Sequence, residues 1–275
     1  MSPDDEDLGN EDLDVAVSDD GAVIRATLDR PEMRNAINEN VLAGLHGALD
    51  AADEGEARVV VIRGAGGTFC SGGDTSEMAR LIDASTQEYR EYLSGISDLM
   101  AAMRNTDALT VAAIEGYCLA GGMGVASAAD LVVAADDATF GTPEKEIGLF
   151  PMQVMAPIMR TVHEKRGMDM LFTGEKFGAE EAQRLGLVSR LFDADGFDDA
   201  LDDYVDLLVN SSPTMISMGK EAYYAHADMG FDEQLGYLKE MFSLLAMSDD
   251  TRDGMEAQMM DQAPDWKIRA DDDGE

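Results

Sequence analysis

The sequence predicts an α/β fold with parallel strands and a helical C-terminal part. Two continuous apolar runs, at residues 59–62 and 110–114, are typical of parallel strands that are buried on both faces. Strand and helix patterns alternate through the first half of the chain, whereas the pattern from Pro151 onward is mostly helical. Such alternation indicates a parallel sheet covered by helices, to which the helical last third is added.

Six segments have the composition and spacing of strands. The first two form a hairpin, because Asp19-Asp20-Gly21 between them is a turn signal. The two buried runs follow, and two short strands come after the second run. The predicted strands are residues 13–18, 22–28, 59–62, 110–114, 131–134 and 138–140.

Three helices of the first half have clear start signals. Asn38 is a suitable N-cap for a helix to about residue 52, whose apolar residues share one face. Ser85, followed three residues later by Glu88, is a capping box that opens a helix to about residue 104. The third helix is expected to begin at Gly121, directly after a buried strand.

The charge of the chain excludes several classes of partner. The 275 residues carry a net charge of −36, so we expect neither a nucleic acid nor an anionic membrane surface as partner. No apolar run is long enough for a membrane-spanning helix, and the first residues lack the pattern of a signal peptide, which predicts a cytoplasmic protein. Part of the negative charge is carried by acidic residues in two predicted disordered tails, residues 1–12 and 270–275. The remaining acidic surface indicates an organism with a very salty cytoplasm, a halophile.

The chemistry is expected at two glycine-rich turns. Each follows a buried strand: residues 64–74 after the first and 116–124 after the second. Neither matches a P-loop or a dinucleotide fingerprint, and the chain has no nucleophile elbow. Glycine lets a backbone N–H approach a ligand closely, so two such turns can form an oxyanion hole; ordinary tight turns are the alternative. Cys70 and Cys118 are expected to be small buried hydrophobes.

Five stretches in order resemble the crotonase (enoyl-CoA hydratase/isomerase) superfamily, over about residues 13–269. One contains Arg30-Pro31, another Cys70-Ser71-Gly72-Gly73-Asp74, and a third Gly121-Gly122-Met123-Gly124. Each stretch alone is a weak indication of the family, but five of them in order and at family-like spacing identify it specifically. The matching stretches are residues 28–38, 60–74, 116–124, 140–151 and 173–188.

The resemblance implies a spiral of ββα units over residues 13–200. It also implies a helical region, residues 201–269, that builds homotrimers, often paired into hexamers. The expected ligand is an acyl-CoA thioester whose carbonyl lies between the backbone N–H groups of Gly73 and Gly121. Coenzyme A is part of the substrate, and no other cofactor and no metal is implied. The residues matching the family's coenzyme A pocket are Arg34, Ala36, Ser71, Asp74, Thr75 and Ser76.

One departure from the family pattern bears on the reaction. The double-bond hydratases of the family carry two catalytic glutamates; one matches Glu144, but the other matches Gly124, which has no side chain. Hydration needs a water that is both held and deprotonated, whereas moving a double bond from position 3 to position 2 needs one base. The sequence therefore favours a single-glutamate isomerase. The alternatives are a 2-enoyl-CoA hydratase of fatty-acid β-oxidation and a non-catalytic coenzyme A-binding member.

Two further points stay open from the sequence. Asp74, Glu77 or Glu146 are candidates to replace the missing carboxylate, although Glu146 is expected to point away from Glu144 in an extended loop. The basic cluster that many family members carry before the final Pro-x-Trp is absent here. A phosphate contact from that region would have to come from Lys267 or Arg269.

Overall fold

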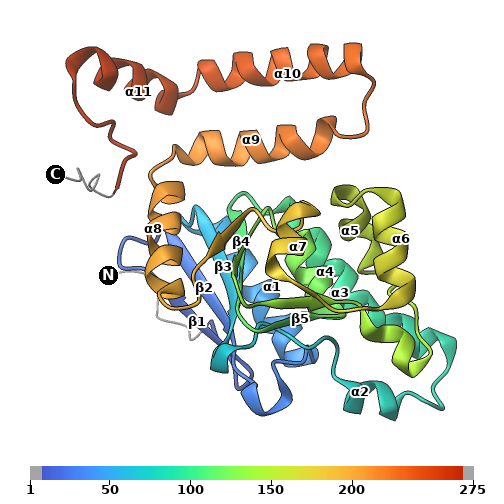
Figure 1. Cartoon of the computed structure of the whole chain (residues 1–275). Coiled ribbons are helices and arrows are strands. Elements are labelled where there is room, and N and C mark those ends of the chain that lie inside the picture. Colours follow the sequence, from blue (N-terminus) through green and yellow to red (C-terminus); the bar gives the residue numbers. More distant parts are fainter. Residues whose placement is uncertain (1–7, 269–275) are drawn as a thin grey trace.

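The centre of the molecule is a six-stranded sheet with the order β1-β2-β3-β4-β6-β9 (Figure 1). In the computed structural model, which describes residues 8–268, β1 and β2 form the expected antiparallel hairpin and all other neighbours are parallel. The strands are β1 (Leu13–Val17), β2 (Val23–Leu28), β3 (Val59–Gly64), β4 (Leu109–Ile114), β6 (Leu131–Ala135) and β9 (Arg190–Phe192).

Both faces of this sheet are buried, which explains the uninterrupted apolar runs. In β3, Val60 and Ile62 face the large cluster that includes the apolar face of α1 (Glu39–Glu54). Val59 and Val61 face the opposite side, against α8 (Phe197–Val209). Both faces of this part of β3 are covered by apolar side chains, so the prediction of buried parallel strands is confirmed.

The helices begin where their capping residues predict. Asn38 Oδ1 accepts the Val41 N–H at 2.9 Å at the start of α1, and Ser85 and Glu88 form the expected capping box. The third predicted start, at Gly121, is also confirmed. The second and third of these helices are α3 (Thr86–Asn105) and α4 (Gly121–Ala128). The remaining helices are α2 (Thr75–Arg80), α5 (Met155–Thr161), α6 (Glu164–Thr173), α7 (Ala179–Arg184), α9 (Pro213–His226), α10 (Phe231–Ala246) and α11 (Asp249–Met260).

A second, three-stranded sheet positions the candidate site. It has the order β5-β7-β8, with β5 (Tyr117–Leu119) parallel to β7 (Thr139–Gly141) and β8 (Phe177–Gly178) antiparallel to β7. Leu119 pairs with Gly141, so the carboxyl ends of β5 and β7 leave the sheet at the same edge. The glycine helix α4 follows β5, and a short 3₁₀ helix, Pro143–Ile147, follows β7.

The C-terminal helices α9, α10 and α11 extend away from the sheets (Figure 1). The predicted boundary between core and helical region, at residue 200, falls inside α8. That helix buries Leu201, Val205 and Val209 against the sheet, so the extension begins after Val209. The sequence signal that separates α8 from the later helices, its more strongly amphipathic pattern, was not used for the predicted boundary.

A buried ion pair attaches α9 to the body. Lys220 Nζ lies 2.8 Å from Asp130 Oδ2, with the two side chains 3% and 8% exposed, and it also donates to the carbonyls of Met103 and Ala108. The Tyr224 hydroxyl donates to the other Asp130 oxygen at 2.7 Å. Burial lowers the pKa of Lys220, and the neighbouring Asp130 carboxylate opposes that shift.

Residues 10–12, which belong to the predicted tail, contact the body of the protein. Asn10 pairs with Leu13 through the backbone, and Asp12 forms an ion pair with Arg30 at 3.1 Å. The predicted tail therefore contributes contacts to the body within residues 10–12. The rest of that prediction, on residues 1–7, and the predicted tail 270–275 lie outside the described residues. No helix in the described part of the chain is both long and apolar enough to cross a membrane.

Candidate active site

The two glycine turns lie directly beside each other. The segment after β3 pairs with β5: the Cys70 N–H donates to the Tyr117 carbonyl and the Leu119 N–H donates to the Cys70 carbonyl, both at 2.9 Å. This pairing brings Gly73 and Gly121 together, since a Cβ built on Gly121 would lie 3.3 Å from the Gly73 nitrogen. The juxtaposition that an oxyanion hole requires is therefore present.

Both N–H groups are available to a ligand. Within residues 8–268 the Gly73 N–H donates to no protein acceptor, and Gly73 is exposed. Gly121 is the first residue of α4, where an N–H has no partner inside the helix and the helix dipole is positive. Ala120 before it has φ +47°, which costs a residue with a side chain of the order of 1–3 kcal/mol. The hydrogen bond from the Ala120 N–H to the Gly141 carbonyl, at 2.9 Å, holds this turn.

Glu144 lies at the same sheet edge as Gly121. It follows β7 in the 3₁₀ helix, three residues after the carbonyl of Gly141 that binds Ala120. Its Oε2 atom is buried and has no hydrogen-bond partner in the described chain. Burial raises the pKa of this carboxyl above its ordinary value. A carboxylate with a raised pKa and a free oxygen is well suited to remove a proton.

The helical turn around Glu144 corrects one expectation. We expected an extended loop in which Glu146 points away from Glu144, but residues 143–147 form a 3₁₀ helix that ends at Gly148 with φ +77°. Pro143 at its start favours this turn. In this 3₁₀ helix Glu146 is exposed, whereas Glu144 is partly buried.

Position 124 lies one turn into α4, among buried residues. Gly124 has no side chain, and the space beside it is occupied by Val154 and Met100. The second carboxylate of the hydratase pattern therefore has neither a side chain nor free space here.

The loops that carry the predicted coenzyme A contacts are joined to each other. The Ser71 N–H donates to the Arg34 carbonyl, and the Ile37 N–H donates to the Gly72 carbonyl. Arg34 has φ +52° and its side chain is exposed. Thr75 and Ser76 are exposed at the start of α2, and Ser71 is partly buried.

Two of the predicted contacts are already engaged within the protein. Asp74 is 4% exposed; its carboxylate binds Arg30 Nη2 at 2.9 Å and caps α2 through the Ser76 N–H at 2.8 Å. The carbonyl of Ala36 accepts a hydrogen bond from Arg30 Nη1 at 2.6 Å. The structure thus places the Asp74 carboxylate in contacts that hold the turn together.

Sequence reasoning missed the role of Arg30 and Asn35 in this framework. Arg30 links Asp12, Ala36 and Asp74. Asn35 is fully buried, and its side chain donates to two carbonyls inside the first glycine turn, those of Ala65 and Thr68. Both residues lie in a stretch that the sequence singled out, but the partners that join it to the first glycine turn, Asp74 for Arg30 and Ala65 and Thr68 for Asn35, are 30 to 44 residues away. No local pattern indicates them.

Of the three candidates to replace the missing carboxylate, Glu77 is the one that is both partly buried and not held in an ion pair within residues 8–268. Its Oε2 atom is buried without a hydrogen-bond partner in the described residues, and the Glu39 N–H binds its carboxylate. Burial and the nearby Asp74 and Glu39 carboxylates raise the pKa of Glu77. Asp74 is held by Arg30, and Glu146 is exposed.

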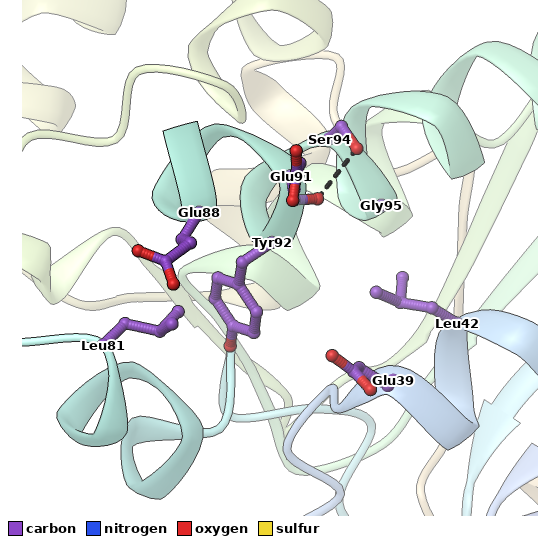
Figure 2. Close-up of a pocket in the computed structure, with 8 residues that line it drawn as sticks. All are labelled: Glu39, Leu42, Leu81, Glu88, Glu91, Tyr92, Ser94 and Gly95. Atoms are coloured by element: carbon purple, nitrogen blue, oxygen red, sulfur yellow. Dashed lines mark hydrogen bonds between the residues drawn. The ribbon is translucent and has the colours of Figure 1, made fainter. Parts of the chain in front are cut away.

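A pocket of about 430 Å³ lies between α1, the end of α2 and α3 (Figure 2). The ring of Tyr92 extends into it from α3, toward Glu39 and Leu81. Burial and the nearby carboxylates of Glu77, Asp74 and Glu39 raise the pKa of Tyr92 to about 12. None of the predicted site residues lines this pocket. Its lining residues are Glu39, Leu42, Leu81, Glu88, Glu91, Tyr92, Ser94 and Gly95.

Comparison with known proteins agrees with this geometry. The family model for enoyl-CoA hydratase/isomerase matches residues 18–269. A protein of Mycobacterium bovis named "Probable enoyl-CoA hydratase echA8" is 31% identical over 93% of this chain and 98% of its own length. The 2,3-dehydroadipyl-CoA hydratase of Escherichia coli K12 is 30% identical over 93% of this chain and 99% of its own length.

Solved structures share the same fold. An enoyl-CoA hydratase of Mycobacterium smegmatis superposes with a TM-score of 0.89 at 28% identity, covering 94% of this chain and 100% of that one. AtuE of Pseudomonas aeruginosa superposes with a TM-score of 0.87 at 30% identity, with the same coverage. The predicted crotonase-like α/β fold is confirmed. The chain belongs to the enoyl-CoA hydratase/isomerase family of enzymes.

Proposed function

We propose that this enzyme moves the double bond of a 3-enoyl-CoA thioester to position 2, with Glu144 as the single base. The main support for the proposal is that, of the two carboxylate positions in the hydratase pattern, only one carries a carboxylate in this chain. Glu144 presents a buried oxygen without a partner in the described chain, whereas Gly124, the position of a second carboxylate, has no side chain.

The chemistry balances with one base. The thioester carbonyl accepts hydrogen bonds from the Gly73 and Gly121 N–H groups, which makes the protons on C2 more acidic. The Glu144 carboxylate removes a C2 proton, and the electron pair forms a dienolate whose oxygen stays between the two donors. Glu144 then returns the proton to C4, which leaves the double bond between C2 and C3. Each oxyanion donor is worth about 3–4 kcal/mol in comparable sites, and the proton transfer needs no other cofactor.

Hydration of a 2-enoyl-CoA, as in fatty-acid β-oxidation, is the second candidate. The names of the relatives favour it, since the curated proteins described above are hydratases by name. It would require a second group to hold and activate water, and Glu77 is the residue whose surroundings best allow this.

Glu144→Gln tests whether the protein is a catalyst of either kind or only a coenzyme A binder. The variant keeps the shape of the side chain and removes the base. We expect turnover to be lost while acyl-CoA binding, measured by calorimetry, stays within about threefold of the unmodified protein. Full activity in the variant would exclude Glu144 as the base.

We further propose that α9, α10 and α11 assemble the chain into a trimer. The support is the apolar surface of these helices: α10 contains no buried residue, and Phe231, Phe242 and Met247 are each more than 70% exposed. Several large apolar side chains exposed on the same helices indicate a protein interface, and a second copy of the chain offers the same apolar surface. Light scattering in molar KCl should give the mass of a trimer, or of a hexamer if trimers pair; a monomer would contradict the proposal.

A further inference from the structure

Val154 occupies the space that a side chain at position 124 would need. A Cβ built on Gly124 would lie 2.5 Å from Val154 Cγ1 and 3.1 Å from Val154 Cβ, closer than packed carbon atoms approach. We propose that Val154 is a specificity-determining residue: it keeps a second acid–base group out of the site and restricts the enzyme to one-base chemistry. This inference rests on the proposed function, in which Glu144 acts alone.

Val154 is buried, and the residue before it is anchored to α3, which opposes a movement of the chain at this point. Val154 is 5% exposed and stands at the N-terminus of α5. The preceding residue, Gln153, anchors this point to α3: its Nε2 donates to the Leu93 carbonyl at 2.6 Å and to Ser97 Oγ at 2.7 Å. A backbone shift at Val154 would disturb these hydrogen bonds of its neighbour.

Met100, the other neighbour of position 124, is a weaker obstacle. Its Sδ lies 3.5 Å from the built Cβ, which is an ordinary van der Waals distance. Met100 also borders a cavity of about 910 Å³ between α3, α5 and α9, and its unbranched side chain has space to move into that cavity. Val154 is therefore the group that decides whether position 124 accepts a side chain.

The chemistry of the valine side chain leads to the same conclusion. Its methyl groups offer no hydrogen bond, and an ordered buried water needs two to four polar partners. A water beside Gly124 would lack them on the side that Val154 covers. The site is thus suited to proton transfer between carbons and unsuited to holding the water of a hydration reaction.

The test restores the missing carboxylate with and without Val154. The variants are Gly124→Glu, Val154→Ala, the double variant Gly124→Glu/Val154→Ala, and Gly124→Gln/Val154→Ala as a control of the same shape without a carboxylate. We expect Gly124→Glu alone to lower Tm strongly and the double variant to recover most of the loss. We expect the double variant to hydrate 2-enoyl-CoA with a kcat/KM at least tenfold above that of the Gln control.

Two results would overturn the inference. One is a Gly124→Glu protein as stable as the double variant, because Val154 would then not occupy the space. The other is a folded double variant whose hydration rate equals that of the Gln control. Failure of the proposed function looks different: the unmodified enzyme would hydrate faster than it isomerises, and the Tm comparison would still show whether Val154 excludes a side chain.

Discussion

The nitrogen of Gly73 lies 3.3 Å from the point where a Cβ on Gly121 would stand, so the two turns leave no room for a side chain between them. Two residues that are 48 positions apart in the chain, one in the turn after β3 and one at the start of α4, thus lie beside each other. The backbone pairing of Cys70 with Tyr117 and Leu119 fixes this relationship.

Gly121→Ala should reduce catalysis far more than stability. The added methyl group would lie 3.2 Å from Ile96 Cδ1 and 3.3 Å from the Gly73 nitrogen, which displaces one oxyanion donor by a few tenths of an ångström. Loss of one donor costs about 10²–10³-fold in kcat. The control is Gly47→Ala in α1, where a Cβ meets nothing within 4 Å; there we expect unchanged kcat. Equal kcat in both variants would exclude the oxyanion role.

The pH dependence of activity should report the raised pKa of Glu144. As a base, Glu144 acts only when ionised, so kcat/KM should rise with pH through the pKa of the free enzyme. Because burial raises that pKa, the acid limb should lie above the ordinary glutamate range near 4.5. The free energy of unfolding should change in the opposite direction to activity. Ionising a buried carboxyl costs free energy, so this group destabilises the fold as pH rises through its pKa. A limb at the ordinary value would show that Glu144 is not desolvated in solution.

Breaking the Lys220–Asp130 pair should loosen α9. Lys220→Met leaves the Asp130 carboxylate, whose side chain is 8% exposed, without its positively charged partner. Removing one charge of a comparable buried pair costs about 3–5 kcal/mol of unfolding free energy. Urea unfolding in molar KCl measures the change. Lys239→Met, whose ion pair with Glu240 is exposed on both sides, serves as the control and should change stability little. A Lys220 variant as stable as this control would refute the anchoring role.

The acidic surface should make stability depend on salt. With a net charge of −36, self-repulsion destabilises the folded state in dilute buffer, and molar salt screens it over about 3 Å. We therefore expect Tm to rise between dilute buffer and molar KCl, as for a protein adapted to a salty cytoplasm. An unchanged Tm would contradict that adaptation.

The sequence predicted the elements whose signals are local. The buried strands follow from apolar runs that both faces of the sheet require, and α1 and α3 follow from Asn38 and from the Ser85–Glu88 capping box. The positions of Gly73, Gly121 and Glu144 came from the family resemblance, and the structure brings these turns to one sheet edge.

Long-range pairing explains what the sequence could not predict. The ion pair between Asp74 and Arg30, which lie 44 residues apart, was not predicted. The block at Gly124 comes from Val154, 30 residues later in the chain. Such contacts leave no trace in residue spacing.

The most direct test of the central claim compares two reactions of the same purified protein in molar KCl. One is conversion of a 3-enoyl-CoA to the conjugated 2-enoyl-CoA, and the other is hydration of that 2-enoyl-CoA. A single-base site predicts that kcat/KM for isomerisation exceeds that for hydration by at least about tenfold, or 1.4 kcal/mol. Faster hydration would contradict the claim and would make Glu77 the first residue to replace.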